Sequence, residues 1–231
     1  MMKMTEPVRV GLMVPINNTT MEREMLGWLP AGSTCTTLRI PRGKGLLTPE
    51  SVPAYKAAAV ELGATFSGLP IDVIAYGCTA AGFILGPKGD AEIARDLAAV
   101  SSLPVVTTAR AMVDALQEAG ARRIALLTPY QDSVNARIQE FLAAGGIEVG
   151  CIDSFRAVDV DALGRITEEE VEQRARAMVD REWDTLFIAC SQLPTLNIVT
   201  PLERYFGKPV MSSIQVTARY AMRRAAAQPK V

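Results

Sequence analysis

Two of the four cysteines stand in matching sequence contexts. Cys78 and Cys190 each end a short apolar run, and each precedes small or hydroxyl-bearing residues, in GCTAAG and ACSQ. A thiol between a strand and a helix meets backbone N–H groups, which lower its pKa and also hold carboxylate oxygens. We therefore interpret this pair as reactive thiols, and Cys35 and Cys151 as small hydrophobic residues of the interior.

The absence of histidine narrows the chemistry that these thiols could perform. It excludes a Ser–His or Cys–His pair and removes the commonest zinc ligand. Acid–base chemistry near neutral pH must then come from Cys, Lys, Tyr, Asp or Glu with a shifted pKa. No dinucleotide-binding or Walker-type glycine motif is present. We expect an enzyme that needs neither a metal nor a cofactor.

Alternating strands and helices must position the two cysteines. The expected strands are 8–14, 35–40, 72–77, 104–107 and 123–128. The expected helices are 19–29, 49–63, 90–100 and 109–119. Continuous apolar strands between amphipathic helices are typical of parallel sheets that are covered on both faces. The fold class is therefore α/β.

The second half of the chain repeats the pattern of the first. VGLMVP resembles IALLTP, IDVIAYGC resembles WDTLFIAC, and LPVVTT resembles KPVMSS, at separations of 114, 112 and 105 residues. Ordered matches at nearly constant spacing indicate an internal duplication. The alternative is that all strands of α/β proteins look alike, but it does not predict a cysteine at the same strand end in both halves.

The duplication predicts two pseudo-symmetric lobes, each a small parallel sheet flanked by helices. Residues 1–115 form the lobe that carries Cys78, and residues 116–212 form the lobe that carries Cys190. The C-terminal helix, 213–227, closes the first lobe. Ligands of such sheets bind outside the carboxyl ends of the strands. We therefore expect an active site in the cleft between the lobes, with the cysteines on opposite sides of a ligand.

Four segments resemble the maleate cis-trans isomerase family of the aspartate/glutamate racemase superfamily. They are VPINNTTME at 14–22, YGCT at 76–79, TPY at 128–130 with VN at 134–135, and ACSQLPT at 189–195. The resemblance spans nearly the whole chain. The cysteine motifs are shared with aspartate/glutamate racemases and hydantoin racemases, whereas the Asn-Thr-Thr-x-Glu stretch favours the isomerases.

The resemblance implies a cofactor-independent conversion of maleate to fumarate. Cys78, as a thiolate, would add to the double bond, and Cys190 would act as acid and base on the opposite side. Covalent addition turns a stiff double bond into a single bond that rotates. The resemblance also implies a set of substrate-binding residues: Pro15, Asn18, Thr79, Ala80, Tyr130, Asn135, Val160 and Ser191.

Most of these binding residues also have a purely structural interpretation. Asn18, Thr79 and Ser191 suit helix caps. Tyr130 suits a packed turn, and Asn135 suits the start of a helix. The basic stretch of Arg39, Arg42 and Lys44 has two interpretations: a position near the mouth of the cleft or, more commonly for such a stretch, a solvated loop.

The chain departs from the isomerase pattern in the loop at 155–163, FRAVDVDAL, which has no asparagine. Val160 stands in the place expected for it, which resembles the apolar pocket of arylmalonate decarboxylases. Those enzymes resemble this chain at Cys190 but lack the first cysteine. The apolar residues after Cys78 also favour a larger or less polar acid than maleate.

Three alternatives therefore remain open beside the isomerase. One is a two-thiol racemase of aspartate, glutamate or hydantoin type, and another is an arylmalonate-type decarboxylase that uses Cys190. The third is a non-catalytic carboxylate-binding module, against which the matched thiols argue.

Bulk properties exclude several partners. The net charge of −1 over 231 residues gives no reason to expect a nucleic-acid partner. The longest uncharged apolar stretch, 73–87, is too short to span a bilayer. No secretory signal is recognisable, so we expect a cytoplasmic protein that acts on a small-molecule carboxylate. The resemblance further implies a homo-oligomer, a dimer or larger.

Overall fold

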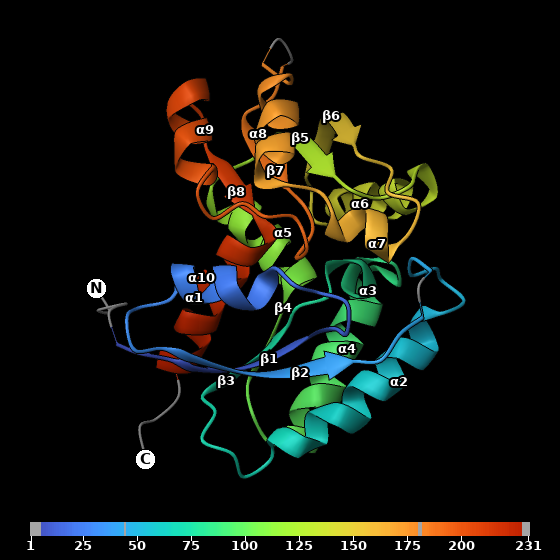
Figure 1. Ribbon diagram of the computed structural model, residues 1–231, viewed down its shortest axis with the longest axis vertical. Coiled ribbons are helices and arrows are strands. Elements are labelled where there is room, and N and C mark those ends of the chain that lie inside the picture. The colour runs from blue at the N-terminus through green and yellow to red at the C-terminus, as the bar shows by residue number, and fades with distance from the viewer. Residues whose placement is uncertain (1–5, 44, 180–181, 228–231) are drawn as a thin grey trace.

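Two four-stranded sheets form the framework of the molecule (Figure 1). The computed structural model describes residues 6–43, 45–179 and 182–227. The first sheet has the order β2-β1-β3-β4, from β1 (Arg9–Pro15), β2 (Thr34–Ile40), β3 (Val73–Tyr76) and β4 (Val105–Thr107). The second has the order β6-β5-β7-β8, from β5 (Arg123–Thr128), β6 (Glu148–Ser154), β7 (Thr185–Ile188) and β8 (Val210–Ser212).

Every strand pair in both sheets is parallel. The two sheets also connect their strands in the same spatial order, which confirms the α/β fold of two similar halves that the duplication predicts. The inner strands β3 and β7 are buried at every residue, as expected for strands covered on both faces. Their carboxyl ends therefore open onto the segments that carry Cys78 and Cys190.

Helices cover the sheets on both faces (Figure 1). Around the first sheet lie α1 (Met21–Trp28), α2 (Val52–Gly63), η1 (Ala64–Phe66), α3 (Thr79–Phe83), α4 (Gly86–Ser101) and α5 (Thr108–Glu118). The later helices are α6 (Asp132–Ala144), α7 (Val160–Gly164), α8 (Glu168–Arg176), α9 (Val199–Phe206) and α10 (Ser213–Ala226). The short helix α3 ends before Gly86, whose φ of 72° is left-handed, and Pro87 opens α4.

Helix α10 follows the last strand of the second sheet but packs against β3, β4, α1 and α5 (Figure 1). The Thr217 hydroxyl on α10 lies 3.2 Å from the Thr108 hydroxyl on α5. The C-terminal helix thereby connects the second sheet to the packing of the first. None of the helices that the structure describes is long and apolar enough to cross a membrane.

Candidate active site

Cys78 and Cys190 line one small cavity, of about 50 Å³, where the carboxyl ends of the two sheets meet. Cys78 lies two residues beyond β3, and Cys190 likewise lies two residues beyond β7. Both side chains are buried, at 4% and 7% exposure. Six of the sequence-predicted binding residues also line this cavity: Pro15, Asn18, Thr79, Ala80, Tyr130 and Ser191.

The Cys78 thiol sits at the N-terminus of α3. Burial raises its pKa, and several neighbours oppose that shift. They are the backbone N–H groups of Ala81 and Ala80, the positive charge of Arg42 and the hydroxyl of Tyr55. Each of these favours the thiolate, so Cys78 is a buried thiol whose ionised form is partly stabilised.

The Cys190 thiol has a different environment. Burial raises its pKa to about 11. Hydrogen bonds from the N–H groups of Gln192 and Leu193 and from the Tyr130 hydroxyl act in the opposite direction and lower this pKa. The Gln192 N–H donates to the sulfur at 3.4 Å. A negative charge on Cys78 raises the pKa of Cys190 further. The two thiols are therefore coupled, and one thiolate beside one thiol is favoured over two thiolates.

Several polar atoms at the cavity make no hydrogen bond of normal geometry within the described residues. Among the residues lining it, Thr79 Oγ1, Tyr130 Oη, Asn17 Oδ1 and Arg42 Nε are buried and lack a hydrogen bond of normal geometry. A buried polar group without a partner costs about 1–3 kcal/mol. Such a cluster around two thiols indicates a cavity built for a small polar ligand.

Asn18 and Ser191 tie the two cysteine segments together. Asn18 Oδ1 accepts from the N–H groups of Thr20 and Met21, at 3.1 and 2.9 Å, and so holds the start of α1. Its Nδ2 donates to the Ser191 carbonyl at 3.1 Å. The Ser191 hydroxyl in turn donates to the Gly77 carbonyl at 2.6 Å. Both residues line the cavity, and their hydrogen bonds connect the segment that carries Cys78 with the segment that carries Cys190.

Comparison with known proteins shows the family to which this chain belongs. A family model described as arylmalonate decarboxylase matches residues 47–231. The maleate isomerase of Nocardia farcinica is 30% identical over 223 residues, which cover 93% of this chain and 89% of that protein. The chain belongs to the family of maleate isomerases and arylmalonate decarboxylases.

A curated decarboxylase and a solved isomerase structure are also similar to this chain. The arylmalonate decarboxylase of Bordetella bronchiseptica is 30% identical over 174 residues, 74% of this chain and 72% of that protein. A solved structure of the Nocardia farcinica maleate cis-trans isomerase, a cysteine-to-serine mutant with a covalently bound succinylcysteine intermediate, superposes with a TM-score of 0.84. It is 28% identical and covers 95% of this chain and 93% of its own.

Two residues that the family resemblance suggested do not line the cavity. Asn135 Oδ1 accepts from the Thr128 hydroxyl at 2.6 Å, and Nδ2 donates to the Tyr130 carbonyl at 3.0 Å. Asn135 therefore holds the Tyr130 turn, and its amide is not available to a ligand. Val160 is buried at the start of α7, after the N-cap Asp159.

Several further residues line the cavity, although none of them is among the substrate-binding residues expected from the sequence. Leu163, one turn after Val160 on α7, lines it in place of that valine. Arg42, Leu46 and Leu47 come from the loop after β2, and Val134 comes from α6. Of the two interpretations of the basic stretch, the position near the cleft therefore holds for the Arg42 side chain. The available signal was the position of this loop, because loops at the carboxyl ends of parallel strands converge on one site.

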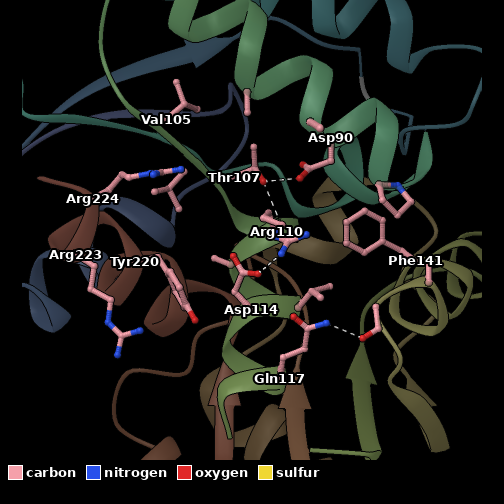
Figure 2. Close-up of a pocket in the computed structure, with 18 of the residues that line it drawn as sticks. Asp90, Val105, Thr107, Arg110, Asp114, Gln117, Phe141, Tyr220, Arg223 and Arg224 are labelled. Carbon is pink, nitrogen blue, oxygen red and sulfur yellow. Dashed lines mark hydrogen bonds and ion pairs between the residues drawn. The ribbon is translucent and has the colours of Figure 1, made fainter. Parts of the chain in front are cut away.

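A hollow larger than the cysteine cavity lies among α4, β4, α5 and α10 (Figure 2). Its volume is about 710 Å³ and it contains no cysteine. Asp90 accepts there from the Thr107 hydroxyl at 2.7 Å, and Arg110 pairs with Asp114 at 2.6 Å (Figure 2). Burial raises the pKa of Asp90 to about 6. Within the described ranges, no group of three His, Cys, Asp or Glu residues could hold a metal ion.

Proposed function

We propose that this protein is a cofactor-independent isomerase that converts maleate to fumarate. The observation that carries the proposal is the pair of buried thiols, one from each sheet, in a single cavity with unpartnered hydroxyls. Its relatives include proteins named maleate isomerase, and the succinylcysteine in one of their structures supports a covalent route. A pair of coupled thiols suits a reaction that needs one nucleophile and one acid.

In the proposed reaction the Cys78 thiolate adds to one alkene carbon of maleate. The π electron pair moves onto the neighbouring carbon and its carboxylate, which becomes enediolate-like. The Thr79 and Tyr130 hydroxyls and nearby backbone N–H groups stabilise this charge. The Cys190 thiol then donates its proton to that carbon.

The central bond of the resulting succinyl thioether is single, and it rotates. The Cys190 thiolate takes the proton back, the C–S bond breaks, and fumarate leaves as Cys78 recovers its electron pair. Each step is the reverse of an earlier one on the rotated skeleton, so the cycle needs no external oxidant, reductant or cofactor.

A decarboxylase is the second candidate, and the apolar lining of the cavity favours it. Leu46, Leu47 and Leu163 suit an aryl or alkyl group better than a second polar group. In that reaction Cys190 would protonate the enediolate left by the loss of carbon dioxide. The thiol at Cys78 argues against this candidate, because a decarboxylase does not need a second thiol facing the first.

Variants of the two cysteines test the proposal. Cys78→Ser should abolish fumarate formation, because an alcohol near its ordinary pKa adds poorly to a double bond. Cys190→Ser should accumulate an adduct on Cys78 whose mass exceeds the free protein by one whole substrate molecule, seen by intact-protein mass spectrometry. Cys35→Ser, in β2 and outside the cavity, is the matched control and should retain activity.

The same variants separate the competing reactions. A racemase predicts no adduct, but exchange of the substrate α-hydrogen in deuterated water. A decarboxylase predicts carbon dioxide release from phenylmalonate that survives Cys78→Ser and stops with Cys190→Ser. Full maleate isomerisation by Cys78→Ser would disprove the proposed function.

A further inference from the structure

Arg42 is the one charged side chain among the described residues that line the cysteine cavity. The rest of that wall consists of apolar residues, neutral amides, hydroxyls and the two thiols. A guanidinium in this setting is weakly hydrated and matches the planar geometry of a carboxylate. A guanidinium beside Cys78 and Cys190 therefore indicates a site for an anionic group of a ligand.

No carboxylate of the described residues pairs with the Arg42 guanidinium in the structure. Its Nη2 donates to the Gly45 carbonyl within the same loop, and its buried Nε has no partner. A guanidinium carries five N–H donors in a fixed fork, and among the described residues only the Gly45 carbonyl accepts from that of Arg42. An anion that enters the cavity would find these donors available.

Arg42 also stands at the boundary between the cavity and the outside. Together with Leu46 and Leu47 it lines a second hollow, of about 340 Å³, bounded further by Ser51 and Tyr55 at the start of α2. Its charge acts on both sides of this boundary. Burial raises the pKa of the Cys78 thiol and that of the Tyr55 hydroxyl, and the positive charge of Arg42 opposes both shifts. The guanidinium is thus close to the thiol that the proposed reaction uses as nucleophile.

We propose that Arg42 binds the second carboxylate of the substrate and makes the site selective for dicarboxylic acids over monocarboxylic ones. This inference rests on the proposed function, in which Thr79 and Tyr130 hold the first carboxylate. On the remaining wall, Ala80 and Leu163 have no side-chain donor. The side-chain donors of Asn18, Ser191 and Gln192 are already used in hydrogen bonds within the protein. A carboxylate against such a wall would be desolvated without compensation, and Arg42 supplies the compensation.

The test measures binding without turnover. Cys78 is alkylated with iodoacetamide, a neutral reagent, while succinate or its monoamide, succinamate, is added at increasing concentration. Peptide mass spectrometry then gives the concentration of each compound that halves the alkylation rate. Succinate carries two carboxylates and no double bond, and succinamate replaces one carboxylate by a neutral amide.

Arg42→Gln should raise the half-protecting concentration of succinate about 10- to 100-fold, the range for losing one hydrogen-bonded charge pair. The preference of the parent protein for succinate over succinamate should disappear in the same variant. Arg42→Lys should retain part of that preference, since it keeps the charge and loses the fork. Arg137→Gln, which removes a positive charge from the surface of α6, is the matched control and should change neither value.

Unchanged protection by succinate in both Arg42 variants would overturn the inference. So would a shift of the pH dependence of alkylation with unchanged protection, because Arg42 would then act on the thiol alone. If the parent protein does not isomerise maleate but is protected by succinate through Arg42, the proposed function fails and the binding role stands. Should Arg42→Gln not fold, the loss or retention of the preference in Arg42→Lys decides the question.

Discussion

The two thiols differ in their surroundings although the duplication relates them. The positive charge of Arg42 favours ionisation of Cys78, whereas the charge that acts on Cys190 is that of Cys78 itself and opposes ionisation. These directions favour a thiolate at Cys78 beside a protonated Cys190. This asymmetry supports Cys78 as nucleophile and Cys190 as acid. The two strand ends are equivalent, so the asymmetry arises from side chains of other segments, such as Arg42 in the loop after β2.

The raised thiol pKa values lead to a first prediction about pH. In the Cys190→Ser variant, alkylation of Cys78 by iodoacetamide should become about tenfold faster per pH unit from pH 6.5 to 8.5, because only the thiolate reacts and its fraction is still small. No plateau should occur below pH 9, since burial holds the pKa of Cys78 above its ordinary value of 9.0. Rates are measured by peptide mass spectrometry.

A plateau below pH 9 in that experiment would contradict the raised pKa of Cys78. The Cys78→Ser variant serves as the control, because its peptide should remain unmodified at every pH.

At the scale of elements, the end of β3 lies very close to β1 and α1. The Gly77 N–H donates to the Met13 carbonyl at 2.7 Å. A Cβ at Gly77 would collide with the sulfur of Met21 on α1 and lie 2.9 Å from Val14 Cγ1 on β1. The glycine before Cys78 is therefore required by packing, which explains its place in the first cysteine motif.

The second prediction follows from this close approach. Gly77→Ala should lower the free energy of unfolding by about 1–3 kcal/mol, the usual cost of overpacking a core. It should also lower turnover, since the displaced strand end carries Cys78. Urea denaturation and steady-state kinetics measure the two effects.

Gly164→Ala on α7 is the matched control for that variant. Its added methyl would have no heavy atom nearer than Gln192 Nε2, at 4.0 Å, and alanine suits a helix better than glycine. Equal stability of Gly77→Ala and Gly164→Ala would show that the end of β3 is not tightly packed.

At the scale of the whole molecule, α1 holds the segment that carries Cys190. The buried carboxylate of Glu24 accepts from the Thr195 N–H at 2.9 Å and from the Thr195 hydroxyl at 3.1 Å. Near it, the Thr19 N–H donates to Gln192 Oε1 at 3.0 Å. The active-site cavity therefore depends on contacts between segments that lie more than 170 residues apart in the chain.

The third prediction concerns this contact. Glu24→Ala should lower the free energy of unfolding by about 2–4 kcal/mol, because it leaves the buried Thr195 N–H without an acceptor and opens a void. Glu24→Gln, which keeps an acceptor oxygen, should cost far less. Urea denaturation of both variants at neutral pH measures the difference.

The Gln variant also has an expected pH dependence. Burial raises the pKa of Glu24 in the folded protein. The stabilisation that the protonated Glu24 side chain provides is therefore fully present below its ordinary pKa of 4.5, and it is lost as the pH rises through the folded-state pKa. The stability of Glu24→Gln relative to the parent should therefore improve from pH 4 to pH 8. A relative stability that falls over this range would mean that folding lowers the pKa of Glu24 instead of raising it.

Sequence alone determined the α/β class, the duplication and the placement of Cys78 and Cys190 at equivalent strand ends. These are properties of local pattern, because apolar runs of strand length and helical periodicity are set by neighbours along the chain. The approach of the two cysteines then followed from a general rule, that carboxyl ends of parallel strands form the binding edge.

Only the tertiary structure decided which side chains enter the cavity. Arg42 faces the thiols, Leu163 replaces Val160, and Asn135 turns inward to hold Tyr130. The direction of each depends on loop paths and on partners from distant segments, which no local pattern encodes. The same holds for α10, whose packing on the first sheet is set by complementary surfaces that meet only after both sheets have formed.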